Sequence, residues 1–174
     1  MVSVNMAKIS ECQIITSADT SCNQIPCTHK VIDFSKISVM LDYGCGKFNR
    51  FKNLVESQGV QYFGYDKYNR TEIENDRALN CKPDIITCNN VLNVIDCENT
   101  INEIIREISS YGVTAVFCVY EGDKSGIGKT TKNGTCYQRN EKACVYQKRL
   151  EKYFRYVIRK SNIFICNSDP RTSI

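Results

Sequence analysis

A predicted buried strand that ends in a pair of glycines is the feature that most constrains this chain. Residues 37–41 are largely apolar, as in a strand of a parallel sheet that is covered on both faces. Asp42 follows the strand, and Gly44 and Gly46 lie two and four residues after Asp42. Glycine adopts backbone conformations that other residues avoid, and it lets a ligand approach the main chain closely. Because ligands of open α/β sheets bind beyond the carboxyl ends of the strands, these residues predict a binding site at this turn.

The rest of the chain alternates between predicted strands and helices. The isoleucines within residues 101–108 recur at helical spacing and give the clearest amphipathic pattern in the sequence. The predicted strands are residues 37–41, 60–65, 84–88, 113–120, 156–158 and 163–166, and the predicted helices cover residues 48–55, 101–108 and 143–154. This alternation predicts a doubly wound α/β domain with a mostly parallel sheet, to which the last two strands add a C-terminal antiparallel hairpin.

Three segments carry weaker patterns. Residues 1–36 are polar and mixed, which predicts a partly ordered N-terminal arm with a short helix near residues 27–34. The domain itself is predicted for residues 37–174. Residues 67–82 are polar and leave room for a short helix and a degenerate edge strand. Residues 121–135 are rich in glycine and lysine and predict a loop.

The composition indicates a globular protein of the cytoplasm. Hydrophobic residues make up 42% and charged residues 24% of the 174-residue chain, and no apolar run is long enough to cross a membrane. The N-terminus lacks the apolar stretch of a secretory signal, so we expect a cytoplasmic location and no membrane partner. The eleven cysteines are odd in number, and several lie in predicted strands, where a free thiol behaves as a small apolar side chain. We therefore expect reduced thiols.

Two cofactors that contain adenosine suit a glycine turn after a strand. The fingerprint of NAD-binding proteins needs a third glycine, but Asn49 occupies that position, and Asp42 would repel a pyrophosphate. S-adenosylmethionine has no phosphate, and its amino group and sulfonium suit an acidic neighbour. Asp66 ends the second predicted strand, 20 residues after Gly46, where a carboxylate can accept hydrogen bonds from both ribose hydroxyls. The two acidic residues therefore favour S-adenosylmethionine over NAD.

Three segments resemble signature motifs of class I S-adenosylmethionine-dependent methyltransferases. They are LDYGCG at residues 41–46, FGYDKY at 63–68 and DIITCNNVLNVI at 84–95, within a resemblance that spans roughly residues 37–166. The resemblance implies a Rossmann-like, doubly wound, mostly parallel seven-stranded sheet with a reversed final strand, and the third strand is abbreviated here. Phe48 departs from the family pattern, because it stands where the first motif has its third glycine. We expect this side chain to narrow the methionine part of the site.

The same resemblance implies which residues bind the cofactor. Asp42, Gly44 and Gly46 would contact the methionine end of the cofactor, and Asp66 would bind the ribose. The residues beside the adenosyl group and the methyl donor would be Asn89, Asn90 and Val91. A narrower resemblance, carried by LDYGCG, NNVLNVI, Gly134, Thr135 and Gln138, is to methyltransferase-like proteins associated with DNA phosphorothioation. Those proteins are longer, so this chain would be a reduced relative.

The catalytic residues are less well defined than the cofactor site. DNA amino-methyltransferases use Asn or Asp followed by two prolines and an aromatic residue, whereas residues 89–92 contain neither. Cys88 is near the place of a cytosine-attacking nucleophile, but it lies in a predicted buried strand without a basic neighbour. His29 is the only histidine and belongs to the N-terminal arm. The candidates for a catalytic role are Asn93, Tyr120 and Gln138.

The acceptor is predicted as an oxygen or nitrogen atom of a nucleic acid or a small molecule. A net charge of +4 is compatible with a nucleic-acid partner. Residues 121–139 form a basic loop that could cover an anionic acceptor. The basic residues of this loop are Lys124, Lys129, Lys132 and Arg139. The loop also resembles a phosphate-binding P-loop, but Asp123 takes the place of the first glycine of that motif.

A second hypothesis belongs to a different functional class. The missing base, the absent prolines and Phe48 also fit a non-catalytic module that binds S-adenosylmethionine or a partner. No metal site is predicted, because Cys22, Cys27 and His29 are spaced too loosely for zinc and no second ligand pair follows them.

Overall fold

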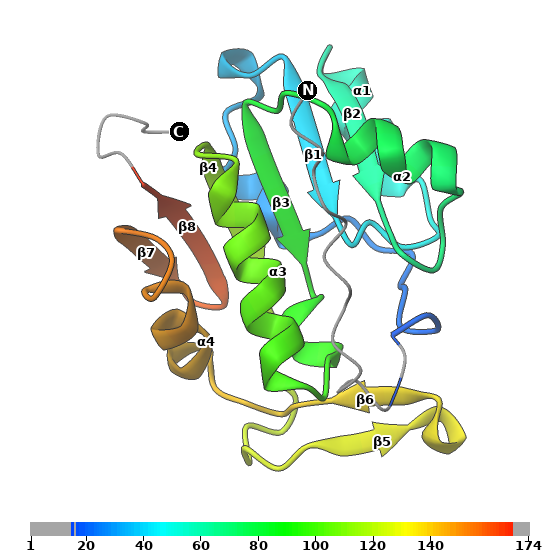
Figure 1. The fold of residues 1–174 in the computed structure, drawn as a ribbon, viewed down its shortest axis with the longest axis vertical. Coiled ribbons are helices and arrows are strands. Elements are labelled where there is room, and N and C mark those ends of the chain that lie inside the picture. Colours follow the sequence, from blue (N-terminus) through cyan, green and yellow to red (C-terminus); the bar gives the residue numbers. More distant parts are fainter. Residues whose placement is uncertain (1–14, 16, 169–174) are drawn as a thin grey trace.

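Four parallel strands lie side by side in a six-stranded sheet in the computed structural model, which describes residue 15 and residues 17–168. The strand order is β2-β1-β3-β4-β8-β7, and β8 runs antiparallel to both of its neighbours (Figure 1). The strands are β1 (Val39–Tyr43), β2 (Gln61–Tyr65), β3 (Ile85–Asn89), β4 (Thr114–Cys118), β7 (Tyr156–Lys160) and β8 (Ile163–Asn167). This arrangement confirms the α/β class and the mostly parallel sheet.

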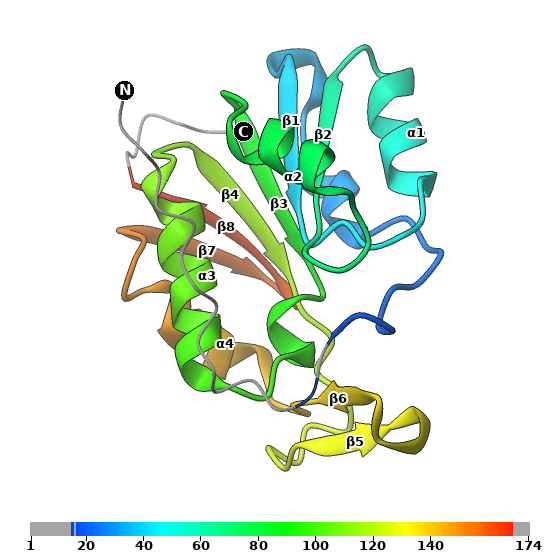
Figure 2. The same cartoon turned by 45° about the vertical axis from the view of Figure 1, so that its right-hand side comes forward.

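Helices cover both faces of the sheet because alternate strand residues pack on opposite sides. In β1, the buried Met40 belongs to the core on one face and the buried Leu41 to the core on the other. The first face packs against α1, and the second against α2, α3 and α4; Figure 2 shows α1 on one side of the sheet and α3 and α4 on the other. The helices are α1 (Arg50–Ser57), α2 (Glu72–Leu79), α3 (Glu98–Ser110) and α4 (Ala143–Leu150).

The amphipathic pattern of residues 101–108 is confirmed in α3. The buried side chains of this helix include Ile101, Ile104, Ile105 and Ile108, and they join the core on the second face. This helix lies in the connection between β3 and β4. It returns the chain along the second face of the sheet, so that the two strands run parallel and both end at the same edge.

The predicted count of seven strands is wrong for the described residues. The segment between β2 and β3 forms α2 and contains no strand, so β2 lies at the edge of the sheet. The physical reason is local, because Thr71 and Glu74 form a capping box that starts a helix in this polar stretch. The third strand of the family pattern is therefore missing rather than short. The antiparallel pair near the C-terminus is present as β7 and β8 and extends beyond the predicted bounds.

Part of the predicted loop at residues 121–135 is a small antiparallel hairpin. Its strands are β5 (Lys129–Thr131) and β6 (Cys136–Gln138), and a 3-10 turn, η4 (Lys132–Gly134), joins them. All three residues of β5 are exposed, so the sequence carries no apolar alternation that could have predicted this strand. In Figure 1 the hairpin lies beyond the carboxyl ends of the parallel strands.

The described part of the N-terminal arm packs onto the first face of the sheet. It contains two 3-10 helices, η1 (Cys27–Val31) and η2 (Phe34–Lys36), near the predicted short helix. Thr28 and Ile32 are buried, and Phe34 contacts the same core. The remainder of the predicted arm, residues 1–14 and 16, lies outside the described residues.

The described cysteines are mostly free thiols. Nine of them are free, including the buried Cys88, Cys118 and Cys166 in strands, as expected. Cys97 is an exception to the predicted reduced state, because it is disulfide-bonded. No helix in the described part of the chain has the length and apolar character that a bilayer crossing requires.

Candidate functional site

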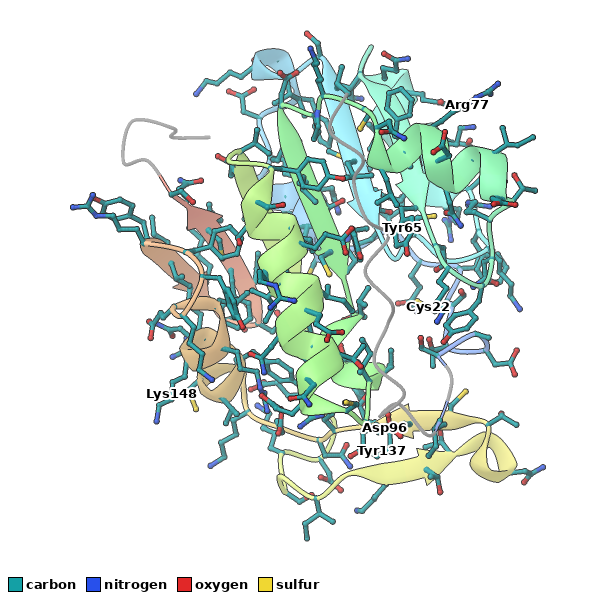
Figure 3. All side chains as sticks on the ribbon, in the orientation of Figure 1. Cys22, Tyr65, Arg77, Asp96, Tyr137 and Lys148 are labelled. Atoms are coloured by element: carbon teal, nitrogen blue, oxygen red, sulfur yellow. The ribbon has the colours of Figure 1, made fainter. Side chains whose placement is uncertain are left out.

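A pocket of about 550 Å³ lies at the carboxyl ends of the parallel strands. Its volume is within the range typical of small-molecule and cofactor sites. The predicted cofactor residues Asp42, Gly44, Gly46, Asp66, Asn89, Asn90 and Val91 all line it, and so do the catalytic candidates Asn93, Tyr120 and Gln138. Tyr65 and Cys22 also line the pocket; in Figure 3, Tyr65 lies at the end of β2, and Cys22 lies between it and the hairpin that carries Tyr137. The structure therefore brings every predicted cofactor and catalytic residue to one cavity.

The glycine turn after β1 passes very close to the loop after β3. Gly44 has a φ of 81°, a conformation that favours glycine, and a Cβ atom at this position would overlap Cγ2 of Val91. The backbone N–H groups of Gly44 and Cys45 donate to the carbonyl oxygen of Tyr65, at 2.7 and 3.0 Å. The turn is thus fixed to the end of β2, and the absence of a side chain at Gly44 allows the loop after β3 to pack against it.

Asp42 joins three strands beneath the glycine turn. Its carboxylate accepts hydrogen bonds from Tyr62 Oη at 2.7 Å, Thr87 Oγ1 at 2.7 Å and Asn89 Nδ2 at 3.1 Å. Burial raises the pKa of Asp42, and these hydrogen bonds oppose that rise. Although Asp42 lines the pocket, its carboxylate is held by protein donors, so its main contribution is to fix the ends of β1, β2 and β3.

Asp66 also has partners within the protein. Its Oδ2 accepts the N–H of Gly46 at 2.8 Å, and its Oδ1 accepts the N–H groups of Tyr68 and Asn69 at 3.0 and 2.9 Å. These bonds connect the loop after β1 to the loop after β2. A carboxylate has about four acceptor positions, so Oδ2 retains capacity for a further donor on the pocket side.

The loop after β3 is shaped by two asparagines. Asn89 accepts a hydrogen bond from Thr28 Oγ1 at 2.8 Å, which ties the end of β3 to η1. Asn90 has a φ of 56°, which asparagine adopts more readily than most residues, and its N–H donates to the carbonyl oxygen of Cys118 at 2.8 Å. This geometry turns the chain sharply, so that Val91 packs against Gly44.

The three catalytic candidates form one hydrogen-bonded cluster. Asn93 Nδ2 donates to Gln138 Oε1 at 3.1 Å, and Asn93 Oδ1 accepts the N–H of Tyr120 at 3.1 Å. Gln138 Nε2 donates to the carbonyl oxygen of Tyr120 at 2.9 Å. The two side-chain amides thus serve mainly to hold the β5–β6 hairpin against the end of β4. The Tyr120 side chain is 61% exposed, and among the described residues its hydroxyl group has no hydrogen-bond partner.

The N-terminal arm supplies a wall of the pocket that the sequence analysis did not anticipate. Residues 17–27 contribute eight lining residues, and Ser21 Oγ accepts the N–H of Lys47 at 3.3 Å beside the glycine turn. Asn69 Nδ2 donates to the carbonyl oxygen of Ala18 at 3.4 Å. His29 is not among the lining residues, and its Nδ1 faces the carbonyl oxygen of Pro26 at 2.6 Å. No periodic pattern marks this segment, so no sequence signal could have found it.

Three basic residues within residues 121–139 face acidic partners. Lys124 pairs with Glu121 at 3.0 Å, and Lys129 pairs with Asp123 at 2.5 Å; both pairs are at the surface. Arg139 is largely buried and belongs to a charge cluster with Glu98, Glu141 and Arg149. The charge of Arg139 is therefore balanced by carboxylates within the fold, whereas the side chains of Lys124 and Lys129 remain accessible to a partner in solution.

Comparisons with known proteins place the fold but not the family. The sequence matches no protein-family model and no curated protein. Its structure is similar to an S-adenosylmethionine-dependent methyltransferase from Mesorhizobium loti, with a TM-score of 0.51, 10% identity and coverage of 80% of this chain and 93% of that chain. It is also similar to the O-methyltransferase of a trans-AT polyketide synthase multienzyme from Brevibacillus brevis, solved with S-adenosyl-L-homocysteine. In that case the TM-score is 0.45, the identity is 14%, and the match covers 73% of this chain and 50% of that chain.

The match to the Mesorhizobium loti protein establishes the class of fold. The chain has the Rossmann-like α/β fold seen in class I S-adenosylmethionine-dependent methyltransferases, without the edge strand beyond β2. The narrower resemblance to proteins associated with DNA phosphorothioation finds no support in the comparisons.

Proposed function

We propose that the protein binds S-adenosylmethionine in this pocket and transfers its methyl group to an oxygen or nitrogen atom of an acceptor. The observation that carries the proposal is the pocket itself, which is lined by the glycine turn, by Asp66 and by residues 89–91. This is the cofactor edge of the fold that the chain shares with the Mesorhizobium loti enzyme.

The residues present fit this cofactor. Because Gly44 has no side chain, Val91 packs directly against the turn. The N–H groups of the turn are bonded to Tyr65 and Asp66, so its carbonyl oxygens would accept hydrogen bonds from the amino group of the methionine part. Asp66 would accept from the ribose hydroxyls through Oδ2, and Asn90 and Val91 would contact the adenosyl group. Asp42 and Asp66 place negative charge near the pocket, which suits a sulfonium and an amino group better than a pyrophosphate.

The chain's own contribution to methyl transfer would be positioning. The cofactor supplies an electrophilic methyl group on its sulfonium, and the acceptor must be held in line with it. Among the described lining residues, those from the end of β4 and from the hairpin are Cys118, Tyr120 and Gln138, with no histidine or carboxylate. Tyr120 would accept or donate one hydrogen bond to the acceptor through its free hydroxyl group. We therefore propose an acceptor that is already nucleophilic at neutral pH.

A non-catalytic cofactor-binding module is the second candidate. It is favoured by the cluster of Asn93, Gln138 and the Tyr120 backbone, because both side-chain amides are engaged with each other or with main chain. Cofactor carrying a labelled methyl group separates the two candidates when the protein is incubated with cell extract. An enzyme transfers label to an acceptor, and Tyr120→Phe slows this transfer. A binding module retains labelled cofactor and labels nothing.

We expect Asp66→Ala to weaken the binding of S-adenosylhomocysteine about tenfold or more, because a charge-assisted hydrogen bond contributes about 1.5–3 kcal/mol. The same substitution should lower the free energy of unfolding, because the N–H groups of Gly46, Tyr68 and Asn69 lose their acceptor. Calorimetric titration and urea unfolding measure the two effects.

Asp84→Ala is the matched control for Asp66. Asp84 Oδ2 accepts the N–H groups of Ser38 and Val39 at 2.7 and 2.9 Å, at the amino end of β1, away from the pocket. The control should lose stability but bind the cofactor product as the parent does. Equal binding by the Asp66 variant and the parent would exclude Asp66 as the ribose ligand.

We propose a nucleic acid as one class of acceptor, contacted by the lysines of residues 121–139. Lys124 and Lys129 are exposed, and each could exchange its acidic neighbour for a phosphate. Binding to DNA or RNA should then weaken with salt, and the double variant Lys124→Ala, Lys129→Ala should reduce the salt slope by about one unit for each phosphate that is no longer neutralised. Binding that is undetectable at low salt, or an unchanged slope, would leave a small molecule as the acceptor.

A further inference from the structure

Two cysteines meet on the wall of the pocket. Cys27 is the first residue of η1, and Cys118 is the last residue of β4, 91 positions later in the chain. Their Sγ atoms lie 3.1 Å apart, and both residues line the cavity. A disulfide requires an S–S distance of about 2.05 Å, so an approach of roughly 1 Å would bring the two atoms to bonding distance.

The surroundings make the two thiols unequal. Cys118 is 3% exposed, and Asn162 Nδ2 points toward its sulfur at 3.6 Å. Burial, together with the hydrogen bond to Cys27, raises the pKa of the Cys118 thiol, which therefore stays protonated at neutral pH. Cys27 is only partly buried and faces the cavity, so small molecules in the pocket reach it first.

Cys27 also lies at the boundary between a weakly attached segment and a buried one. The covering segment, residues 17–26, precedes it and lines the pocket, whereas Thr28 follows it and is fully buried. The covering segment is attached by a few hydrogen bonds near the surface, including Lys47 N–H to Ser21 Oγ and Arg50 Nη1 to the carbonyl oxygen of Asn23. Segments held in this way open locally at low free-energy cost.

We propose that Cys27 and Cys118 are a redox-sensitive pair whose oxidation joins the N-terminal arm to β4 and slows ligand exchange through the pocket. The oxidant is a low-molecular-weight disulfide. The Cys27 thiolate attacks one of its sulfur atoms and releases one small thiol. Cys118 then loses its proton and attacks Cys27 Sγ, and the second small thiol leaves. Two protein thiols are oxidised by two electrons, and the small disulfide is reduced to two thiols.

The first test asks whether the bond forms. The full chain is incubated with glutathione disulfide, remaining thiols are alkylated, and peptides are mapped by mass spectrometry. We expect a peptide pair linked through Cys27 and Cys118, which dithiothreitol releases and which is absent from both Cys27→Ser and Cys118→Ser. The exposed Cys22 reports that the oxidant has reacted, and Cys22→Ser should retain the link. A stable glutathione adduct on Cys27, or alkylation of both cysteines after Cys22 has reacted, would overturn the pairing.

The second test measures the effect on the pocket and rests on the proposed function. In the oxidised protein, association and dissociation of S-adenosylhomocysteine should both be roughly fivefold slower than in the reduced protein, because local opening is restricted. Cys27→Ser should show equal rates under both conditions. Equal rates in the oxidised and reduced parent would refute the effect on exchange.

Hydrogen exchange of residues 17–26 gives a readout that needs no cofactor. Slower exchange in the oxidised protein supports the proposal even if no cofactor binds, an outcome that would contradict only the proposed function. Unchanged exchange in a protein that carries the Cys27–Cys118 link would contradict the mechanical role of the bond.

Discussion

Replacing Gly44 by alanine is expected to abolish binding of S-adenosylmethionine and to lower the free energy of unfolding by about 2–5 kcal/mol, the sum of a left-handed backbone penalty and overpacking. Gly44 has a φ of 81°, and the added methyl group would overlap the β-branched side chain of Val91. Val91 has little freedom to move aside, so the loops after β1 and β3 would separate. These two loops form the proposed cofactor site, which explains why binding and stability should fall together.

Gly59→Ala separates the two causes. Gly59 has a φ of 79°, almost the same as Gly44, but a Cβ atom there would meet nothing within 4 Å. This control should lose only the backbone term of about 1–2 kcal/mol and should bind the cofactor as the parent does. Urea unfolding and calorimetric titration of the three proteins provide the comparison. Equal losses of stability in the two variants, or normal binding by Gly44→Ala, would show that the turn is not packed as described.

Replacing Arg149 by methionine should lower the free energy of unfolding by about 2–4 kcal/mol. This is below the cost of breaking a fully buried pair, because Glu98 is partly exposed and Arg139 still pairs with Glu98 and Glu141. Arg149 Nε and Nη1 donate to Glu98 Oε1 and Glu141 Oε2, each at 2.6 Å, and its side chain is 9% exposed. Methionine preserves much of the side-chain volume, so the loss would report mainly the charges. Arg155→Met is the control, because Arg155 is exposed and should change stability by less than about 0.5 kcal/mol.

The cost of Arg149→Met should depend on pH. Burial alone would raise the pKa of Glu141, but hydrogen bonds from Arg149 and Arg139 outweigh it, and the pKa lies below its ordinary value of 4.5. A lowered pKa in the folded state contributes stability above pH 4.5, and that contribution disappears as the pH falls through the folded value. The difference between parent and variant should therefore shrink in acid. A difference that stays constant from neutral to acid pH would show that the charges are not its cause.

The sequence predicted the part of the site that belongs to the sheet. The apolar run before Asp42, the glycine pair and the isoleucines of α3 follow simple periodicities that local structure obeys. From those patterns we predicted that Asp42, Gly44 and Gly46 lie at the carboxyl ends of the parallel strands, where the pocket is found. The predicted α/β class and mostly parallel sheet are also confirmed, whereas the predicted strand between β2 and β3 is missing.

The parts that the sequence did not predict depend on tertiary contacts. Residues 17–26 have no periodic pattern, and their position over the pocket depends on hydrogen bonds to distant loops, such as Asn69 to Ala18. The exposed strand β5 is stable because β6 pairs with it and Gln138 ties β6 to Tyr120. Asn93 and Gln138 were predicted from motif position as catalytic candidates, whereas their mutual hydrogen bond indicates a structural role that only the folded chain reveals.

Calorimetric titration of the reduced protein with S-adenosylhomocysteine tests the central claim most directly. We expect a single site with a micromolar dissociation constant, about −7 to −8 kcal/mol, and loss of that binding in Gly44→Ala but not in Gly59→Ala. Neither heat nor a thermal shift at millimolar ligand, from a protein that unfolds cooperatively, would contradict the assignment of this pocket to S-adenosylmethionine.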